Sequence, residues 1–123
     1  MPQTNFITEK IIGCAIAVHR EFGPGVLESV YENSLCVEFD DTGIRYAKQC
    51  IVPAFYKHIN VGNYRVDLLV EDKIIVEIKA VEVLLPIHEA QIIHYLKLTK
   101  KRIGLIMNFN VCRLADGIRR FAV

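Results

Sequence analysis

Residues 64–80, Tyr-Arg-Val-Asp-Leu-Leu-Val-Glu-Asp-Lys-Ile-Ile-Val-Glu-Ile-Lys-Ala, decide the fold expected for this 123-residue chain. Two β-prone runs, 64–70 and 74–80, flank a polar tripeptide, 71–73, that is typical of a hairpin loop. With that loop, Val70 lies opposite Ile74, and counting back places Asp67 opposite Glu77. Side chains alternate along a strand, so one face is expected to be apolar and the other to concentrate the charges. The predicted apolar face holds Val66, Leu68, Val70, Ile74, Val76, Ile78 and Ala80, and the charged face holds Arg65, Asp67, Leu69, Ile75, Glu77 and Lys79, with Arg65 opposite Lys79.

The two opposed carboxylates predict a site for a hard cation. Directly opposed residues of an antiparallel pair have Cβ atoms about 4.5–5.5 Å apart, and like charges there are destabilising. Without metal, one carboxyl is expected to have a raised pKa, whereas a divalent ion bridging both favours ionisation. Oxygen ligands favour Mg²⁺ or Mn²⁺. Lys79 would lie beside Asp67 and Glu77, where it could orient water for phosphodiester hydrolysis; the alternative is a salt-bridge network on a solvated face.

The rest of the chain predicts helices around this hairpin. Apolar spacing indicates helices over about 7–22, with Thr8 or Asn5 as cap, and 27–43, and Pro86 can begin a third that runs to about Leu98 with Ala90, Ile93 and Leu96 inward. An irregular strand is expected at 51–56, where Pro53 indicates an edge or a bulge, followed by a turn at Gly62-Asn63. Residues 103–109 read as a buried strand, and the last fourteen give at most a short ribbon from 111–114 and 118–121. This order predicts an α/β fold of the α+β type, with a mixed sheet flanked by helices.

Composition favours one soluble domain spanning 1–123. Hydrophobic residues make up 52% and charged residues 24%, and neither a signal peptide nor a membrane-spanning stretch is expected, so we predict a cytoplasmic protein with no membrane partner. The net charge of +1 means that a polyanion would have to be held by a local patch. The basic group at 97–102 reads most simply as a solvated helix end. The four cysteines have no metal-site spacing and are expected to be buried thiols, although an iron–sulfur cluster of all four stays open.

Two further groups are candidates for the same site. His88, Gln91 and Tyr95 share a helix face and could line the cleft, although an exposed Gln91 is equally compatible with the pattern. His88-Glu89 does not form a zinc helix, because the next histidine is six residues on. Glu28 and Glu32 lie one helical turn apart, and either could supply a further carboxylate, unless they serve as helix-dipole partners.

Several ordered blocks resemble a known family. Residues 25–32, Gly-Val-Leu-Glu-Ser-Val-Tyr-Glu, resemble the signature of the GxxExxY family, and its later blocks are similar to 66–70, 76–80, 86–91 and 104–109. That family is placed in the PD-(D/E)XK nuclease-like superfamily. The resemblance implies a restriction-endonuclease-like αβββαβ core with an extra N-terminal helix. Val66 occupies the place of the proline in the superfamily's title motif.

The resemblance also implies a set of roles. It carries the metal-binding Asp onto Asp67, the Glu and Lys onto Glu77 and Lys79, and the helical Gln onto Gln91. It leaves open whether Glu28 or Glu32 is the helical carboxylate. The expected catalytic residues are Asp67, Glu77, Lys79, Gln91, Glu28 and Glu32, the expected metal ligands are Asp67, Glu77, Ile78 and Glu32, and His88, Tyr95 and Arg65 are expected to line the site.

The function expected from these residues is Mg²⁺- or Mn²⁺-dependent hydrolysis of nucleic acid. We predict a nuclease acting on DNA rather than RNA, with an endonuclease and a homodimer among the expectations. The alternative is a catalytically inactive module of the same fold that binds nucleic acid or oligomerises.

Overall fold

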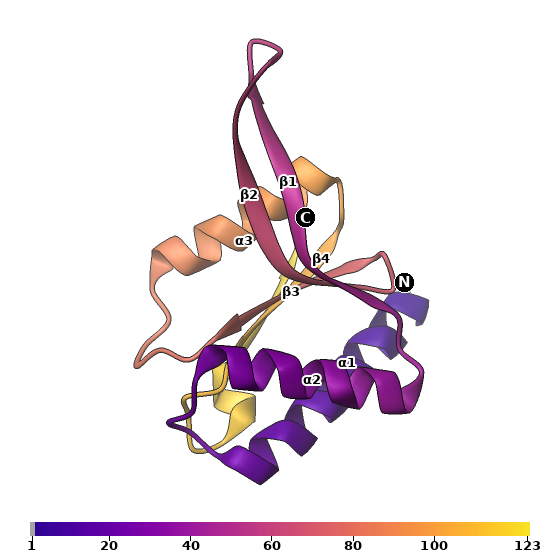
Figure 1. Ribbon diagram of the computed structural model, residues 1–123, viewed down its shortest axis with the longest axis vertical. Helices are drawn as coiled ribbons and strands as arrows, with labels where there is room; N and C mark the ends of the chain where they lie inside the picture. The colour runs from indigo at the N-terminus through magenta and orange to yellow at the C-terminus, as the bar shows by residue number, and fades with distance from the viewer. Residues whose placement is uncertain (1) are drawn as a thin grey trace.

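The computed structural model describes residues 2–123, with side chains from residue 4 onward. In this part of the chain three α-helices and a five-stranded sheet form an α+β fold of the restriction-endonuclease-like type, and the expected αβββαβ core with an extra N-terminal helix is confirmed (Figure 1). The sheet order is β1-β2-β3-β4-β5, and every neighbouring pair is antiparallel except β3 and β4, which are parallel. The elements are α1 (Pro2–Phe22), α2 (Glu28–Thr42), β1 (Tyr46–Tyr56), β2 (Ile59–Val70), β3 (Ile74–Lys79), α3 (Pro86–Thr99), β4 (Ile103–Asn108), the 3₁₀ turn η1 (Leu114–Gly117) and β5 (Ile118–Ala122).

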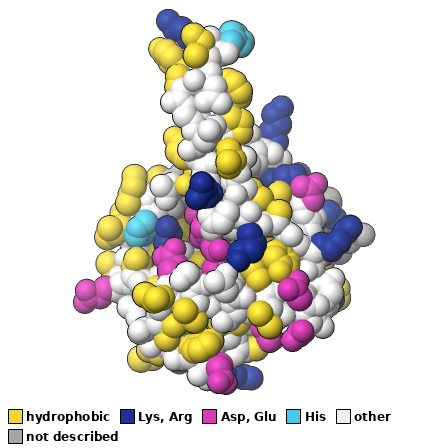
Figure 2. Space-filling view, in the orientation of Figure 1, with side chains coloured by type: hydrophobic (Ala, Val, Ile, Leu, Met, Phe, Trp, Pro, Cys, Tyr) yellow, Lys and Arg dark blue, Asp and Glu magenta, His cyan; other side chains and the backbone are white. Residues whose placement is uncertain are grey.

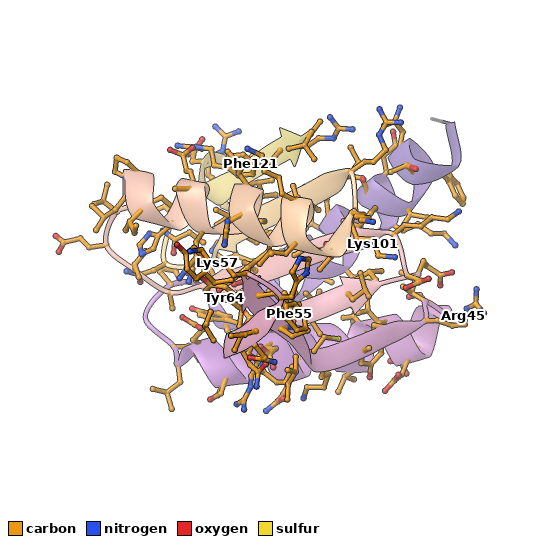
Figure 3. All side chains as sticks on the ribbon, turned by 90° about the horizontal axis from the view of Figure 1, so that it is seen from above. Arg45, Phe55, Lys57, Tyr64, Lys101 and Phe121 are labelled. Carbon is orange, nitrogen blue, oxygen red and sulfur yellow. The ribbon has the colours of Figure 1, made fainter. Side chains whose placement is uncertain are left out.

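The sheet lies between two helical layers, with α1 and α2 packed on one face and α3 on the other (Figure 1). Figure 3 shows α2 and α3 on opposite sides of the strands. Side chains of β3 alternate between the layers, so Val76 packs in the α1–α2 core and Ile75 in the α3 core. Neighbouring residues of β4 divide in the same way, with Leu105 facing α1 and α2 and Ile106 facing α3. Burial on both faces explains the continuous apolar run of β4 and the three successive apolar residues, 74–76, that begin β3.

The register expected for the central hairpin is confirmed up to Leu68. Val70 pairs with Ile74 and Leu68 pairs with Val76, but the ladder between β2 and β3 ends there. The residues of β2 that precede Leu68 pair with β1 alone, and Arg65 pairs with Ile51. The expected pairing of Arg65 with Lys79 is therefore wrong.

Val66 does not share the apolar face of Leu68, which corrects a second expectation. Val66 packs in the α3 core, whereas Leu68 packs against α1 and α2. On the neighbouring strand the backbone between Lys48 and Cys50 passes through Gln49, whose φ is +50°, in the left-handed region that non-glycine residues rarely adopt. The distorted point lies beside Asp67, and alternation therefore does not carry across it.

The β1–β2 hairpin extends from the body of the molecule as an arm (Figure 1). Its turn is formed by Lys57 and His58, with φ of +49° and +68°, and the predicted turn at Gly62-Asn63 is wrong because those residues lie within β2. The pairing register shifts between Ala54 and Phe55. Pro53 lies on the edge strand next to this irregularity, as its missing N–H predicted.

The helices differ from the expectations in their ends and faces. α1 begins at Pro2, so Thr8 is not its cap, and the Thr8 hydroxyl donates to the Thr4 carbonyl within the helix. Pro86 begins α3 as expected, but Ala90 is exposed and Ile93 only half-buried, and the buried residues are Ile92, Tyr95 and Leu96. Of the helices described, none is both long and apolar enough to cross a bilayer.

The last fourteen residues form η1 and β5, and β5 adds an edge strand to β4. The expected ribbon from 111–114 and 118–121 is therefore right only for its second part. Gly117 fits against the backbone of Asn108, since a Cβ added there would lie 2.1 Å from the Asn108 carbonyl oxygen.

The four cysteines are free thiols. Cys14 and Cys36 are buried as expected, but Cys50 is half-buried and Cys112 is exposed.

Candidate active site

Asp67 and Glu77 meet where β2 and β3 separate. The Asp67 backbone N–H donates to Oε2 of Glu77, and the Ile78 backbone N–H donates to Oδ2 of Asp67, both at 2.8 Å. Each carboxylate thus satisfies a backbone donor on the opposite strand that would otherwise lose its ladder partner. The reciprocal hydrogen bonds hold the two side chains together, as the register predicted, although the ladder itself has ended.

Burial makes this pair unfavourable when both members are ionised. Glu77 is 5% exposed, and burial together with the charge of Asp67 raises its pKa to about 8. Burial also raises the pKa of Asp67, against the opposing effects of the Ile78 N–H, Lys79 and Gln49. The pair therefore resists holding two negative charges without a further cation.

Helix α2 adds two glutamates to the same region. Burial and the charge of Asp67 raise the pKa of Glu28, whereas Lys79 and the Ala80 backbone lower it. Burial also raises the pKa of Glu32, and hydrogen bonding to Gln49 opposes this effect. The charge of Glu28 also raises the pKa of Glu77, and the charge of Asp67 also raises the pKa of Glu32. Both helical carboxylates therefore interact with the central pair, and the choice between them as the metal-site carboxylate stays a prediction.

Gln49 is a site residue that the sequence analysis missed. Its amide Nε2 donates to both carboxylate oxygens of Glu32, at 3.0 and 3.1 Å, and its side chain also lowers the pKa of Asp67. Gln49 therefore links the helical acid to the central pair. Only its glutamine type in an irregular strand could have indicated this role, because its left-handed backbone is not visible in the sequence.

The loop before α2 is held by the residues that resemble the GxxExxY signature. Gly25 has a φ of +90°, which permits the tight turn. Three residues after Glu28, the Tyr31 hydroxyl donates to the Gly23 carbonyl at 2.5 Å and accepts from the Val26 N–H at 3.2 Å. The Tyr31 ring is buried and stacks on Phe109, with centroids 4.6 Å apart. Gly25, Glu28 and Tyr31 therefore provide the turn, a carboxylate that interacts with the central pair, and the anchor of α2.

Lys79 provides the positive charge at this end of β3. It lowers the pKa values of Glu28, Asp67 and Glu77, yet it forms no ion pair within 4.0 Å of a described carboxylate. The next segment is held by buried Asn108, whose amide donates to the Val81 carbonyl at 2.9 Å and accepts from the Val81 N–H at 3.0 Å. Asn108, also missed from the sequence, therefore fixes the chain just after Lys79.

The four remaining candidates lie at different distances from the acids. Tyr95 is buried, and its pKa is raised by burial and by the charges of Glu77 and Asp67, so it lines the site. His88 accepts the Leu85 N–H at 3.1 Å and so caps α3. Gln91 lies one turn before Tyr95 but is exposed and makes no side-chain hydrogen bond to another described residue. Arg65 is exposed on the arm and is not brought to the pair by strand pairing.

The exposed surface reflects this distribution of charge. Figure 2 shows acidic side chains gathered in the middle of one face, at the foot of the arm, with basic side chains beside them. Among the residues that the structure describes, no three His, Cys, Asp or Glu side chains are grouped closely enough to hold a metal ion together. The core of the candidate site is thus the carboxylate pair of Asp67 and Glu77, which interacts with Glu28 and Lys79.

A family model described as the PD-(D/E)XK nuclease superfamily matches residues 5–121. The chain therefore belongs to the PD-(D/E)XK nuclease superfamily, whose nucleases generally use divalent metals. The match does not extend to the finer resemblance to GxxExxY proteins, which stays a prediction. No curated protein and no solved structure matches the chain.

Proposed function

We propose that the protein is a divalent-metal-dependent nuclease that hydrolyses phosphodiester bonds. The observation that carries this proposal is the reciprocal Asp67–Glu77 pair beside Lys79. The PD-(D/E)XK nuclease superfamily supplies the reaction class, and its restriction-endonuclease-like fold favours DNA over RNA.

The donor set fits Mg²⁺ or Mn²⁺. Asp67 and Glu77 each have a second oxygen that accepts no backbone hydrogen bond, and their raised pKa values favour a nearby cation. Mg²⁺ usually keeps several waters and takes only one or two carboxylates from the protein, so a third acidic side chain is not required. Asp67, Glu77 and the Ile78 carbonyl would hold the ion, with Glu28 or, through a rearranged Gln49 contact, Glu32 in support. When bound, a divalent ion supplies polarisation of the phosphate and acidification of water.

The protein's own residues provide orientation and charge. Lys79 would hold the attacking water or a phosphate oxygen, because its ammonium is close to the acids but not committed to an ion pair with them. Gln49 would keep Glu32 and Asp67 in place. Tyr95 would exclude water on the α3 side, and Gln91, one turn earlier, would contact the substrate. His88 would act through the start of α3, and Arg65 through the strand leading to Asp67.

The test is cleavage of single- and double-stranded DNA and RNA in Mg²⁺, in Mn²⁺ and in chelator. We expect metal-dependent cleavage that falls at least about a hundredfold in Asp67→Asn, Glu77→Gln and Lys79→Met. Glu82→Gln is a matched control, because Glu82 is exposed and lies just past β3. Cleavage that survives in Asp67→Asn and Glu77→Gln alike would defeat the assignment.

Calorimetric titration with Mn²⁺ separates the enzyme from an inactive module of the same fold. The nuclease should bind Mn²⁺ in a manner abolished by Asp67→Asn. No Asp67-dependent binding, together with retained binding to an oligonucleotide, would support the inactive module.

We also propose that two copies associate through the arm. Large apolar side chains there are exposed, and such a group on a protruding element is typical of an interaction surface. Figure 2 shows hydrophobic side chains along the arm. The exposed residues are Ile51, Phe55, Tyr56, Ile59 and Val61. Light scattering should give twice the monomer mass, and Phe55→Ser with Ile59→Ser should restore the monomer; an unchanged mass in that variant would exclude this surface.

A further inference from the structure

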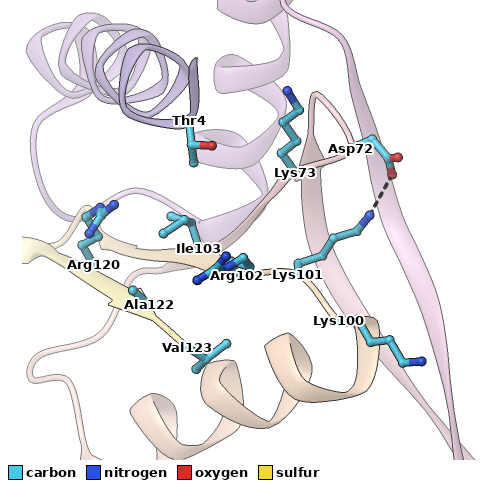
Figure 4. Close-up of a pocket in the computed structure, with 10 residues that line it drawn as sticks. All are labelled: Thr4, Asp72, Lys73, Lys100, Lys101, Arg102, Ile103, Arg120, Ala122 and Val123. Carbon is cyan, nitrogen blue, oxygen red and sulfur yellow. Dashed lines mark hydrogen bonds and ion pairs between the residues drawn. The ribbon is translucent and has the colours of Figure 1, made fainter. Parts of the chain in front are cut away.

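A basic pocket lies at the other end of the central strands from the acids. Its volume is about 310 Å³, and its lining comes from α1, the β2–β3 turn, the loop before β4, and β5 (Figure 4). Lys73 immediately precedes β3, whereas Glu77 and Lys79 lie toward its end. At about 3.3 Å per residue, the strand separates Lys73 from these two residues by about 13 and 20 Å. The pocket is therefore distinct from the candidate active site.

The pocket gathers five of the chain's 15 lysine and arginine side chains in one place. Five cationic side chains line it against one carboxylate, a net of +4, although the whole chain has only +1. The rest of the chain therefore has a net charge of −3. The five cations are Lys73, Lys100, Lys101, Arg102 and Arg120, and the carboxylate is Asp72.

Ion pairing within the pocket leaves the charges of its two arginines available. Lys101 pairs with Asp72 at 3.3 Å, and Figure 4 shows this contact at the rim, with Lys100 extending away from Ile103. Arg102 and Arg120 form no ion pair with a described carboxylate, and Arg120 donates only a 3.4 Å hydrogen bond to the Asn5 amide. The basic group is more than the solvated end of a helix, because Lys73 and Arg120 come from other elements.

We propose that this pocket binds a backbone phosphate of a nucleic acid strand, at a distance from the bond being cleaved. The inference rests on the proposed nuclease function. Clustered carboxylates at the active site repel a polyanion, so attraction must come from elsewhere on a nearly neutral protein. Arginine and lysine are the side chains that supply phosphate contacts. Along one strand of a duplex the charges are about 3.4 Å apart, so the 13–20 Å separation corresponds to about four to six nucleotides.

The test is the binding of fluorescently labelled single-stranded DNA of 3, 6 and 12 nucleotides in chelator, where cleavage does not interfere. Arg102→Gln with Arg120→Gln should weaken binding of the 12-mer about tenfold and reduce the salt slope of log K by about 1.4, since each lost contact to single-stranded DNA removes about 0.7. Arg20→Gln with Arg113→Gln removes the same charge from exposed positions outside the pocket and should change the affinity less than about twofold. The 3-mer should bind the wild-type protein more weakly than the 12-mer, because it makes fewer phosphate contacts.

Equal weakening by the two double variants would overturn the proposal, because only total charge would then matter. Loss of affinity for pyrophosphate in the pocket variant, without loss for the 12-mer, would also overturn it and would indicate a site for free phosphates. The measurement needs no cleavage. An inactive protein that still shows the pocket-dependent 12-mer binding would refute the nuclease proposal alone.

Discussion

Replacing Glu77 by glutamine should stabilise the metal-free protein at alkaline pH. Glu77 has a pKa of about 8 in the fold, raised first by burial and then by Asp67, against the ordinary glutamate value of 4.5. The fold therefore favours the protonated form. The stability associated with this proton is fully present below about pH 4.5 and is lost as the pH rises through about 8.

The size of the effect follows from linkage. One pKa unit corresponds to about 1.4 kcal/mol, so the difference between 4.5 and about 8 sets an upper limit of about 5 kcal/mol, and relaxation of the site should reduce this to about 2–5 kcal/mol. Glutamine does not ionise, and its amide oxygen can still accept the Asp67 N–H. The free energy of unfolding of Glu77→Gln should therefore decline less between pH 5 and pH 9 and exceed that of the wild type at pH 9.

Urea unfolding followed by circular dichroism, at unit steps from pH 5 to pH 9 in chelator, measures this difference. The pKa of Glu71 is lowered chiefly by the Arg45 backbone N–H, so Glu71 changes the free energy of unfolding with pH in the opposite direction. This contribution should be the same in the wild type and in Glu77→Gln. Glu82→Gln makes the same charge change at an exposed position and should follow the wild type. Saturating Mn²⁺ should reduce the advantage of Glu77→Gln, because a bound cation stabilises the ionised wild type. Parallel profiles for the wild type and Glu77→Gln in chelator would refute the reasoning.

Three other substitutions test the supports of the site. Gln49→Gly should relieve about 1 kcal/mol or more of left-handed backbone strain, measured by thermal unfolding, and should weaken Mn²⁺ binding, measured by calorimetry. A variant that is both less stable and weaker in Mn²⁺ binding would contradict the predicted relief of strain. Gly117→Ala should cost about 1–3 kcal/mol in urea, because the new Cβ would lie 2.1 Å from the Asn108 carbonyl oxygen, and an unchanged midpoint would disprove the close contact. Tyr31→Phe should cost about 0.5–1.5 kcal/mol and speed amide exchange at Val26, whereas unchanged exchange would mean that the hydroxyl does not hold the loop.

The central hairpin could be predicted from sequence because its register depends on local information. A three-residue polar loop and the alternation of side chains suffice to bring Asp67 towards Glu77. The same rule failed at Val66, because β2 pairs with β3 only from Leu68 to Val70 and because Gln49, on the neighbouring strand beside Asp67, has a left-handed backbone. Alternation applies only while the strand remains regular.

Residues whose role depends on an unusual backbone or on distant partners could not be predicted. Gln49 reaches Glu32 from a left-handed position that its residue type does not favour. The basic pocket joins Lys73 and Arg120, which are far apart in sequence and come together only through the order of the strands. Exposure of Gln91, by contrast, was one of the two outcomes that its helical pattern allowed.

The divergence of β2 from β3 gives each acid a structural task in addition to its proposed chemical one. Asp67 and Glu77 accept the Ile78 and Asp67 backbone N–H groups that the ended ladder leaves behind. An alanine at either position would leave a partly buried backbone N–H without an acceptor, at a cost of about 1–3 kcal/mol, while also removing a charge. Loss of activity in an alanine variant would therefore not distinguish a loss of stability from a loss of catalysis. Asparagine and glutamine keep the acceptor and remove only the charge, so they isolate what the carboxylates contribute to binding a cation.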